Sequence, residues 1–352
     1  MTTKIRFSIL AMLVLGCASV FAQTIEPLGS FDIKSSLPPN YAVDRIAVRA
    51  FAANNSGLYF LIDVNPQHPP IAKMLILHTD SAGVRQKLIL LPPTGLGLHG
   101  VEKRQFGEIQ VDSSGNVYLS QWKMSPDTPQ NSFTVYNLNG NKTNVTALGP
   151  KESISTFCLN NDNLFYIDGT PVFRPTLASI RGLSTKQDSV AQWEAYGPLR
   201  LRSLTSSKLV VLEMIDCRLQ IIDLSSGDRT TVSLESIPSI MKGIAAQHPD
   251  EYGRHTEKTK HVARSVVVND IVTTTNGDIL LNVMGHHISQ GAVIVRLDKD
   301  GSFLRSMRYK LPSFDELKTE EFPGGQMNTD CIGVSGTHLF VQGDGKVAKF
   351  PL

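Results

Sequence analysis

A short pattern, a tight turn followed by β-favouring residues, recurs six times and constrains the fold more than any other feature of the sequence. The copies are NNSGLYFLID (54–63), DSSGNVYLS (112–120), NNDNLFYID (160–168), TSSKLVVLEM (205–214), TTNGDILLNV (274–283) and VSGTHLFVQG (334–343). Their first strand residues are Leu58, Val117, Leu164, Leu209, Ile279 and Leu339, so successive copies lie 59, 47, 45, 70 and 60 residues apart. Spacing of this size indicates one supersecondary unit that is stacked on its neighbours to bury a shared core.

Each copy belongs to a larger four-stranded unit. An apolar run precedes the turn, and a second pair of strands follows it, joined by Gly/Asn/Asp-rich turns typical of hairpins. These turns are HTDSAG (78–83), NLNGNK (137–142), DLSSGD (223–228) and LDKDGS (297–302). Six such units with almost no helical periodicity predict an all-β chain, a six-bladed β-propeller with four antiparallel strands per blade. A seven-bladed ring would need a further repeat, and the third and fourth copies are weak.

The two ends of the chain are predicted to meet in the last blade. The sixth unit offers only three good strands, which end at GKVAKFPL (345–352). The missing outer strand is predicted in TIEPLGSFDI (24–33), at the start of the mature chain. Pairing both ends in one blade would close the ring and cover its sheet edges.

The repeats resemble those of the broad six-bladed propeller superfamily, which includes NHL-repeat proteins, TolB-like domains and calcium-dependent lactonases. DSSGNVYLS (112–120) is the segment most similar to the NHL core. The resemblance covers nearly the whole mature chain and implies a fold. Functions differ widely among these families, so it implies no single activity.

The N-terminus has the features of a secretory signal peptide. Lys4 and Arg6 precede an apolar stretch from Phe7 to Gly16, and Val20-Phe21-Ala22 resembles a cleavage site. We therefore expect a signal peptide over 1–22 and a single domain over 23–352, exported to the periplasm or secreted. Alternatively, Val14-Leu15-Gly16-Cys17 resembles a lipobox, which would attach a lipid anchor to Cys17. No transmembrane segment is predicted in the mature chain.

Charge and cysteine content exclude several classes of protein. Removal of Lys4 and Arg6 reduces the 34 basic residues to 32, which equals the 32 acidic ones. A chain without basic excess lacks the electrostatic signature of a nucleic-acid-binding protein. Cys158, Cys217 and Cys331 are widely spaced, which favours buried thiols over a disulfide framework, with one disulfide as the alternative.

Most extra length is expected in the loops of one propeller face. They cover 63–72, 92–107, 121–132, 168–177, 236–264, 283–292 and 312–327, and 236–264 is an insertion with a predicted short helix. Long loops on one face mark the expected binding face. Polar and aromatic residues in or beside these loops are the predicted ligand-binding set: His99, Arg104, Trp122, Arg174, His255, His286 and His287.

A metal site is the alternative reading of the polar residues near the starts of the predicted inner strands. Hard cations such as calcium prefer oxygen ligands. The candidate ligands are Glu108, Asn269, Asp270, Asn328 and Asp330. The equally simple interpretation is that these residues cap strands or bind channel water.

These observations favour an exported binding or scaffold protein that engages a small polar ligand or a protein partner through its long-loop face. The alternative is a metal-dependent hydrolase, similar to the calcium lactonases, that acts at the mouth of the central channel. No cofactor is expected under the first hypothesis, and calcium is expected under the second. Neither hypothesis identifies catalytic residues.

Overall fold

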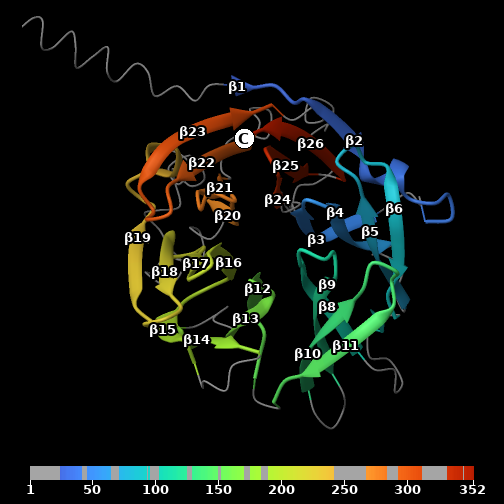
Figure 1. Cartoon of the computed structure of the whole chain (residues 1–352), viewed down its shortest axis with the longest axis horizontal. Helices are drawn as coiled ribbons and strands as arrows, with labels where there is room; N and C mark the ends of the chain where they lie inside the picture. Colours follow the sequence, from blue (N-terminus) through green and yellow to red (C-terminus); the bar gives the residue numbers. More distant parts are fainter. Residues whose placement is uncertain are drawn as a thin grey trace, which may run out of the picture.

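Six β-sheets surround one axis like the blades of a propeller in the computed structural model (Figure 1). The structure describes residues 24–41, 46–64, 71–92, 94–95, 103–124, 129–149, 152–169, 175–183, 189–241, 267–283, 292–310, 331–343 and 345–352. The predicted all-β, six-bladed architecture is confirmed, and each sequence repeat contributes the second strand of one blade.

Five blades are formed by four consecutive strands each. Blade 1 contains β3 (Ile46–Asn54), β4 (Gly57–Val64), β5 (Ile71–Thr79) and β6 (Arg85–Leu90), with β7 (Thr94–Gly95) paired to β5. Blade 2 contains β8 (Lys103–Val111), β9 (Val117–Met124), β10 (Pro129–Tyr136) and β11 (Lys142–Ala147). Blade 3 contains β12 (Thr156–Asn160), β13 (Asn163–Asp168), β14 (Thr176–Gly182) and β15 (Ala191–Ala195). Blade 4 contains β16 (Leu199–Thr205), β17 (Lys208–Glu213), β18 (Arg218–Asp223) and β19 (Arg229–Ser233). Blade 5 contains β20 (Val268–Thr273), β21 (Ile279–Val283), β22 (Ala292–Leu297) and β23 (Phe303–Tyr309).

Blade 6 is closed by the N-terminal segment, as predicted. Its three consecutive strands are β24 (Cys331–Ser335), β25 (His338–Gly343) and β26 (Lys346–Pro351), and β2 (Gly29–Asp32) pairs antiparallel with β26. The segment also contacts a second blade, because β1 (Thr24–Ile25) pairs parallel with β23. A short 3-10 helix, η2 (Ile33–Ser36), follows β2. The N-terminal segment therefore joins blades 5 and 6 along the rim of the ring.

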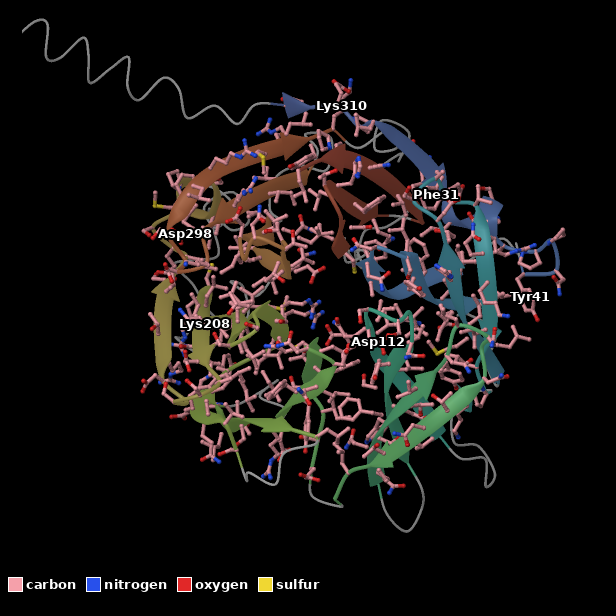
Figure 2. The ribbon with its side chains drawn as sticks, in the orientation of Figure 1. Phe31, Tyr41, Asp112, Lys208, Asp298 and Lys310 are labelled. Atoms are coloured by element: carbon pink, nitrogen blue, oxygen red, sulfur yellow. The ribbon has the colours of Figure 1, made fainter. Side chains whose placement is uncertain are left out.

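Each interface between neighbouring blades is filled by apolar side chains. Alternation along β4 shows why: Phe60 and Ile62 pack toward blade 6, whereas Tyr59 and Leu61 pack toward blade 2. The described residues form six buried clusters, one for each of the six interfaces. Figure 2 shows side chains filling the spaces between blades, with Phe31 near the rim. The fold thus depends on sheet-to-sheet packing in a closed circle.

The tight turns have a common geometry that explains their composition. The Asp112 carboxylate accepts hydrogen bonds from the backbone N–H groups of Ser114 and Asn116. Gly115 then adopts a φ of +80°, which favours glycine. The turn at Asp298 has the same pattern and joins β22 to β23.

Polar side chains at these turns link neighbouring blades. Asn54 donates through Nδ2 to the carbonyl of Asp112, and Asn160 donates in the same way to the carbonyl of Thr205. On the next interfaces, Thr273 donates to the Ser203 carbonyl, and Ser335 donates to the Asn54 carbonyl. The tight-turn face is therefore held together by side chain–backbone hydrogen bonds as well as by apolar packing.

Cys158, Cys217 and Cys331 form no disulfide. Cys158 and Cys217 are buried, as expected for thiols in apolar runs, while Cys331 is partly exposed. Cys17 lies outside the described residues.

The insertion begins with a helical turn at 238–241, as predicted, with Ile237 and Ile240 buried. The remainder of the insertion lies outside the described residues. Among the residues that the structure does describe, no helix is long and apolar enough to span a membrane.

Candidate functional site

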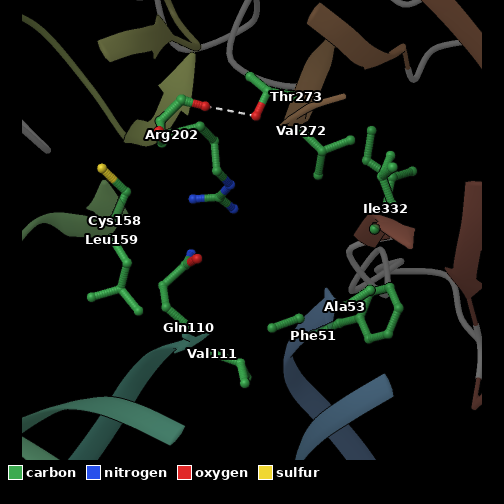
Figure 3. A pocket seen from close by; sticks show the side chains of 14 residues that line it. Phe51, Ala53, Gln110, Val111, Cys158, Leu159, Arg202, Val272, Thr273 and Ile332 are labelled. Carbon is green, nitrogen blue, oxygen red and sulfur yellow. Dashed lines mark hydrogen bonds between the residues drawn. The ribbon is translucent and has the colours of Figure 1, made fainter. Parts of the chain in front are cut away.

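A cavity of about 180 Å³ lies on the axis and is lined by the innermost strand of every blade. Figure 3 shows the Arg202 side chain extending from β16 into this space, with Gln110 of β8 reaching toward it. The walls combine apolar side chains, such as Phe51, Val111 and Ile332, with polar groups that supply most of the exposed lining. Apolar walls with convergent polar groups are the usual features of a small-molecule site.

The cavity is closer to the tight-turn face than to the long-loop face. All six inner strands run in the same direction along the axis, because each is followed by a tight turn into the second strand of its blade. Gln110 and Val111 come two and three residues after Glu108, and Val272 comes two residues after Asp270. The cavity therefore lies between the tight turns and a polar layer that contains Glu108 and Asp270.

The inner strands of blades 6 and 1 lie unusually close together beside the cavity. Gly333 of β24 lies so close to β3 that a Cβ atom there would be 2.6 Å from Phe51 Cε1 and 2.9 Å from Ala53 Cβ. Real Cβ atoms do not approach this closely, so the close contact between the two inner strands requires glycine.

Arg202 is the centre of a polar network that connects four blades. Its Nη1 donates to Glu108 Oε1 on β8 at 2.5 Å and to the Leu201 carbonyl at 2.8 Å. Its Nη2 donates to Asp270 Oδ1 on β20 at 3.4 Å. Glu108 Oε2 in turn accepts from the Thr156 hydroxyl on β12 at 2.6 Å. One guanidinium group thus joins side chains of blades 2, 3, 4 and 5.

The network also fixes the backbone. Asp270 Oδ2 accepts from the backbone N–H of Ile332 on β24 at 3.0 Å, which extends the connection to blade 6. Thr156 Oγ1 accepts from the backbone N–H of Leu201 at 3.1 Å. Because these bonds cross several blade interfaces, they set the relative positions of the inner strands around the cavity.

Burial and charge act in opposite directions on the two carboxyl groups. Burial alone would raise the pKa of Glu108, but the charges of Arg202 and Arg200 and the Thr156 hydrogen bond lower it below the ordinary value. At Asp270 burial outweighs the same two arginines, so the pKa of this carboxyl is raised. Burial would lower the pKa of Arg202, but Glu108 and Asp270 raise it, so the guanidinium stays charged.

The predicted metal ligands fall into two groups. Glu108 and Asp270 converge on the channel, as the metal reading requires, but each is paired with Arg202. Asn269 is buried on β20. Asn328 and Asp330 lie outside the described residues. In the part of the chain that the structure covers, no three His, Cys, Asp or Glu side chains form a group that could hold a metal ion.

Five of the seven predicted ligand-binding residues lie outside the described residues: His99, Arg174, His255, His286 and His287. Trp122 is partly exposed near the end of β9, and its backbone pairs with Gln105 and Asn131. Arg104 lies on β8, opposite Lys123. Two predicted loops are shorter than expected, because β8 begins at Lys103, β9 extends to Met124 and β10 begins at Pro129.

Sequence reasoning missed Arg202, the central residue of the network. The segment LRLRSL (199–204) alternates apolar and polar residues, which is typical of a strand with one solvent-facing side. In the structure the apolar set faces blade 3 and includes Leu199 and Leu201. The one available signal was the position of this segment directly before the fourth repeat. That position makes it an inner strand, so its polar side chains can face the channel.

No protein-family model matches the sequence, and no curated protein matches it either. Among solved structures, a Hadza microbial sialidase has a TM-score of 0.56 at 9% identity, covering 92% of this chain and 68% of that one. A calcium-binding regucalcin from Agrobacterium tumefaciens has a TM-score of 0.46 at 11% identity, covering 94% and 95%. A protein of unknown function from Bacteroides caccae has a TM-score of 0.44 at 12% identity, covering 76% and 83%. Likeness at such identities extends to the fold alone, and on the strand topology this chain is a six-bladed β-propeller.

Proposed function

We propose that this protein is an exported binding protein that holds a small ligand in its central channel. The observation that carries the proposal is the cavity of about 180 Å³ into which Arg202 points (Figure 3). A cavity of about 150 Å³ can hold a molecule as large as benzene, so this one has room for a compact ligand. Export is proposed on the signal-like N-terminus alone.

The chemistry of the cavity supports binding better than catalysis. Burial raises the pKa of the Cys158 thiol, which disfavours the nucleophilic thiolate. Glu108 and Asp270 are paired with Arg202, so neither carboxylate is positioned to attack a substrate or to activate water. The cavity offers directed hydrogen-bond donors beside apolar side chains, which are the features of a binding site.

A cavity-filling variant tests the proposal. Gln110 reaches into the cavity and contacts Glu108 only weakly, at 3.5 Å, so Gln110→Phe should fill the space with little damage to the network. Val272→Phe fills it from the opposite wall. The matched control is Gln86→Phe on the exposed strand β6.

Benzamide, benzoate and cyclohexanone serve as probes, and their binding is measured by thermal shift and by calorimetric titration. We expect at least one to stabilise the wild type, by about 1.4 kcal/mol at ten times its Kd. Gln110→Phe and Val272→Phe should lose this stabilisation, while Gln86→Phe should keep it. Stabilisation that survives both filling variants, or none by any probe, would contradict the proposal.

A further inference from the structure

We propose that the channel ligand is an uncharged molecule with a carbonyl-type oxygen, which accepts hydrogen bonds from the edge of Arg202 that faces away from Glu108. This inference rests on the proposed function and adds the chemical class of the ligand. Three properties of the cavity carry it: the balance of charge, the unused donors of Arg202 and the composition of the walls.

The charge of Arg202 is already balanced inside the protein. Glu108 and Asp270 are its ion-pair partners, and the charge of Arg200 acts on both carboxyl groups. Two positive and two negative side chains give the cluster a formal charge of zero. The side chains of Arg202, Glu108 and Asp270 are only 14%, 17% and 8% exposed, so water screens them poorly. An anionic ligand would add an uncompensated negative charge beside two carboxylates, which is unfavourable in such an environment.

Arg202 nevertheless keeps donors for a neutral ligand. A guanidinium group has five N–H donors. Bonds to Glu108, Leu201 and Asp270 use three of them, two from Nη1 and one from Nη2. The Nε–H and the second Nη2–H have no acceptor among the described residues. Two N–H groups on a rigid planar group, next to a cavity, suit one or two oxygen acceptors.

Gln110 adds a neutral polar group on the wall formed by blade 2. Its amide reaches toward Arg202 in Figure 3, and its described hydrogen bond is the long one to Glu108. A carboxamide offers a donor and an acceptor, so it can bind either half of a ligand amide group without adding charge. Together with Arg202, it can hold a carbonyl oxygen and a neighbouring N–H.

The other walls determine the body of the ligand. Phe51, Val111, Leu159 and Val272 present hydrocarbon to the cavity. The volume of about 180 Å³ fits a body close to benzene in size, with one polar substituent. The ligand class is therefore a compact, uncharged molecule that carries an amide or ketone.

Benzamide and benzoate form a matched pair of probes, because they differ little in shape but differ by one charge. Calorimetric titration of the wild-type protein at pH 7 should show benzamide binding at least about tenfold more tightly than benzoate. Glu108→Gln gives the cluster a net positive charge, so the preference for benzamide over benzoate should become smaller or reverse. Asp270→Asn should act in the same direction and provides a second variant. Glu194→Gln, an exposed position on β15, is the control and should leave the preference unchanged.

The possible outcomes separate this inference from the proposed function. If benzoate binds the wild type as tightly as benzamide or more tightly, and Gln110→Phe abolishes both, the channel binds ligands but the inference on charge is wrong. If the preference for benzamide is the same in Glu108→Gln and Asp270→Asn as in the wild type, the electrostatic reasoning is also wrong. If benzamide, benzoate and cyclohexanone all fail to bind, or if benzamide and benzoate bind Gln110→Phe as tightly as they bind the wild type, the proposed function itself fails.

Discussion

Replacing Arg202 with methionine tests the polar network most directly. Methionine keeps much of the length of the side chain but removes the charge and all the donors. Glu108 and Asp270 then lose their shared cation, although their side chains are only 17% and 8% exposed. Breaking a buried ion pair from one side typically costs about 3–5 kcal/mol, because an uncompensated charge stays behind. We expect Arg202→Met to lose about that much free energy of unfolding at pH 7.

The pH dependence of this loss identifies its cause. Without Arg202, burial raises the pKa of both carboxyl groups in the folded state. A group with a raised folded-state pKa favours folding below its unfolded pKa, and this contribution is lost as the pH rises. The deficit of Arg202→Met should therefore be small near pH 4 and grow toward pH 7.

A triple variant separates charge from packing. Arg202→Met combined with Glu108→Gln and Asp270→Asn contains no charge at these three positions, and the amides can still accept the hydrogen bonds of Thr156 and Ile332. We expect it to recover more than half of the stability lost in Arg202→Met, as measured by urea unfolding. If the triple variant is less stable than Arg202→Met at every pH, lost packing rather than stranded charge explains the defect, and the account of the network is refuted.

Three further predictions follow from particular contacts. Glu108→Gln should cost less stability at acidic pH than at pH 7, because the lowered pKa of Glu108 stabilises the fold above its unfolded pKa. Asp270→Asn should show the opposite trend, because the pKa of Asp270 is raised. Urea unfolding at several pH values measures both losses, and losses that change with pH in the same direction would contradict this assignment. Gly333→Ala should lower the free energy of unfolding by about 1–3 kcal/mol, because the added methyl group overpacks the site. Gly336 has no neighbour within 4 Å of an added Cβ atom but has a φ of +57°, so Gly336→Ala should cost about 1–2 kcal/mol through backbone strain. Only Gly333→Ala should change the near-ultraviolet circular dichroism of the core. Deletion of residues 24–33 should expose the outer edge of blade 6 and increase aggregation in light scattering, and light scattering equal to that of the wild type would argue against the closure of the ring by this segment.

The propeller could be predicted from sequence because its signal is local and repeated. Each copy places a tight turn before an apolar strand, and both depend on the intrinsic preferences of a few adjacent residues. Leu58, Leu209 and Ile279 align because each is the first or second residue of a second strand that is buried on both faces. The N-terminal strand was predictable from a strand count, since the sixth repeat lacked one. Its second contact, between β1 and β23, was not, because two residues carry no recognisable pattern.

The network in the channel could not be predicted in the same way. Arg202 lies 94 residues from Glu108 and 68 from Asp270 in the sequence. Nothing in the local sequence of any of them indicates the other two. Glu108 and Asp270 were recognised as channel residues from their places at predicted inner strands, but oxygen ligands of a metal and acceptors for a guanidinium have the same sequence signature. Only closure of the ring shows that an arginine lies between them.

The position of the cavity favours the tight-turn face of the propeller, and not the long-loop face, as the side on which a channel ligand binds. Loop length favoured the face with the long connections, since insertions collect where binding surfaces form. In the described residues, however, the cavity between the inner strands lies toward the tight turns. There, hydrogen bonds such as the one from Ser335 to the Asn54 carbonyl link one blade to the next. Short turns give a rigid rim, and a rigid rim keeps the donors of Arg202 in place before a ligand arrives, which reduces the entropic cost of binding. A small channel ligand therefore depends on the tight-turn side of the ring, and variants such as Gln110→Phe test that side directly.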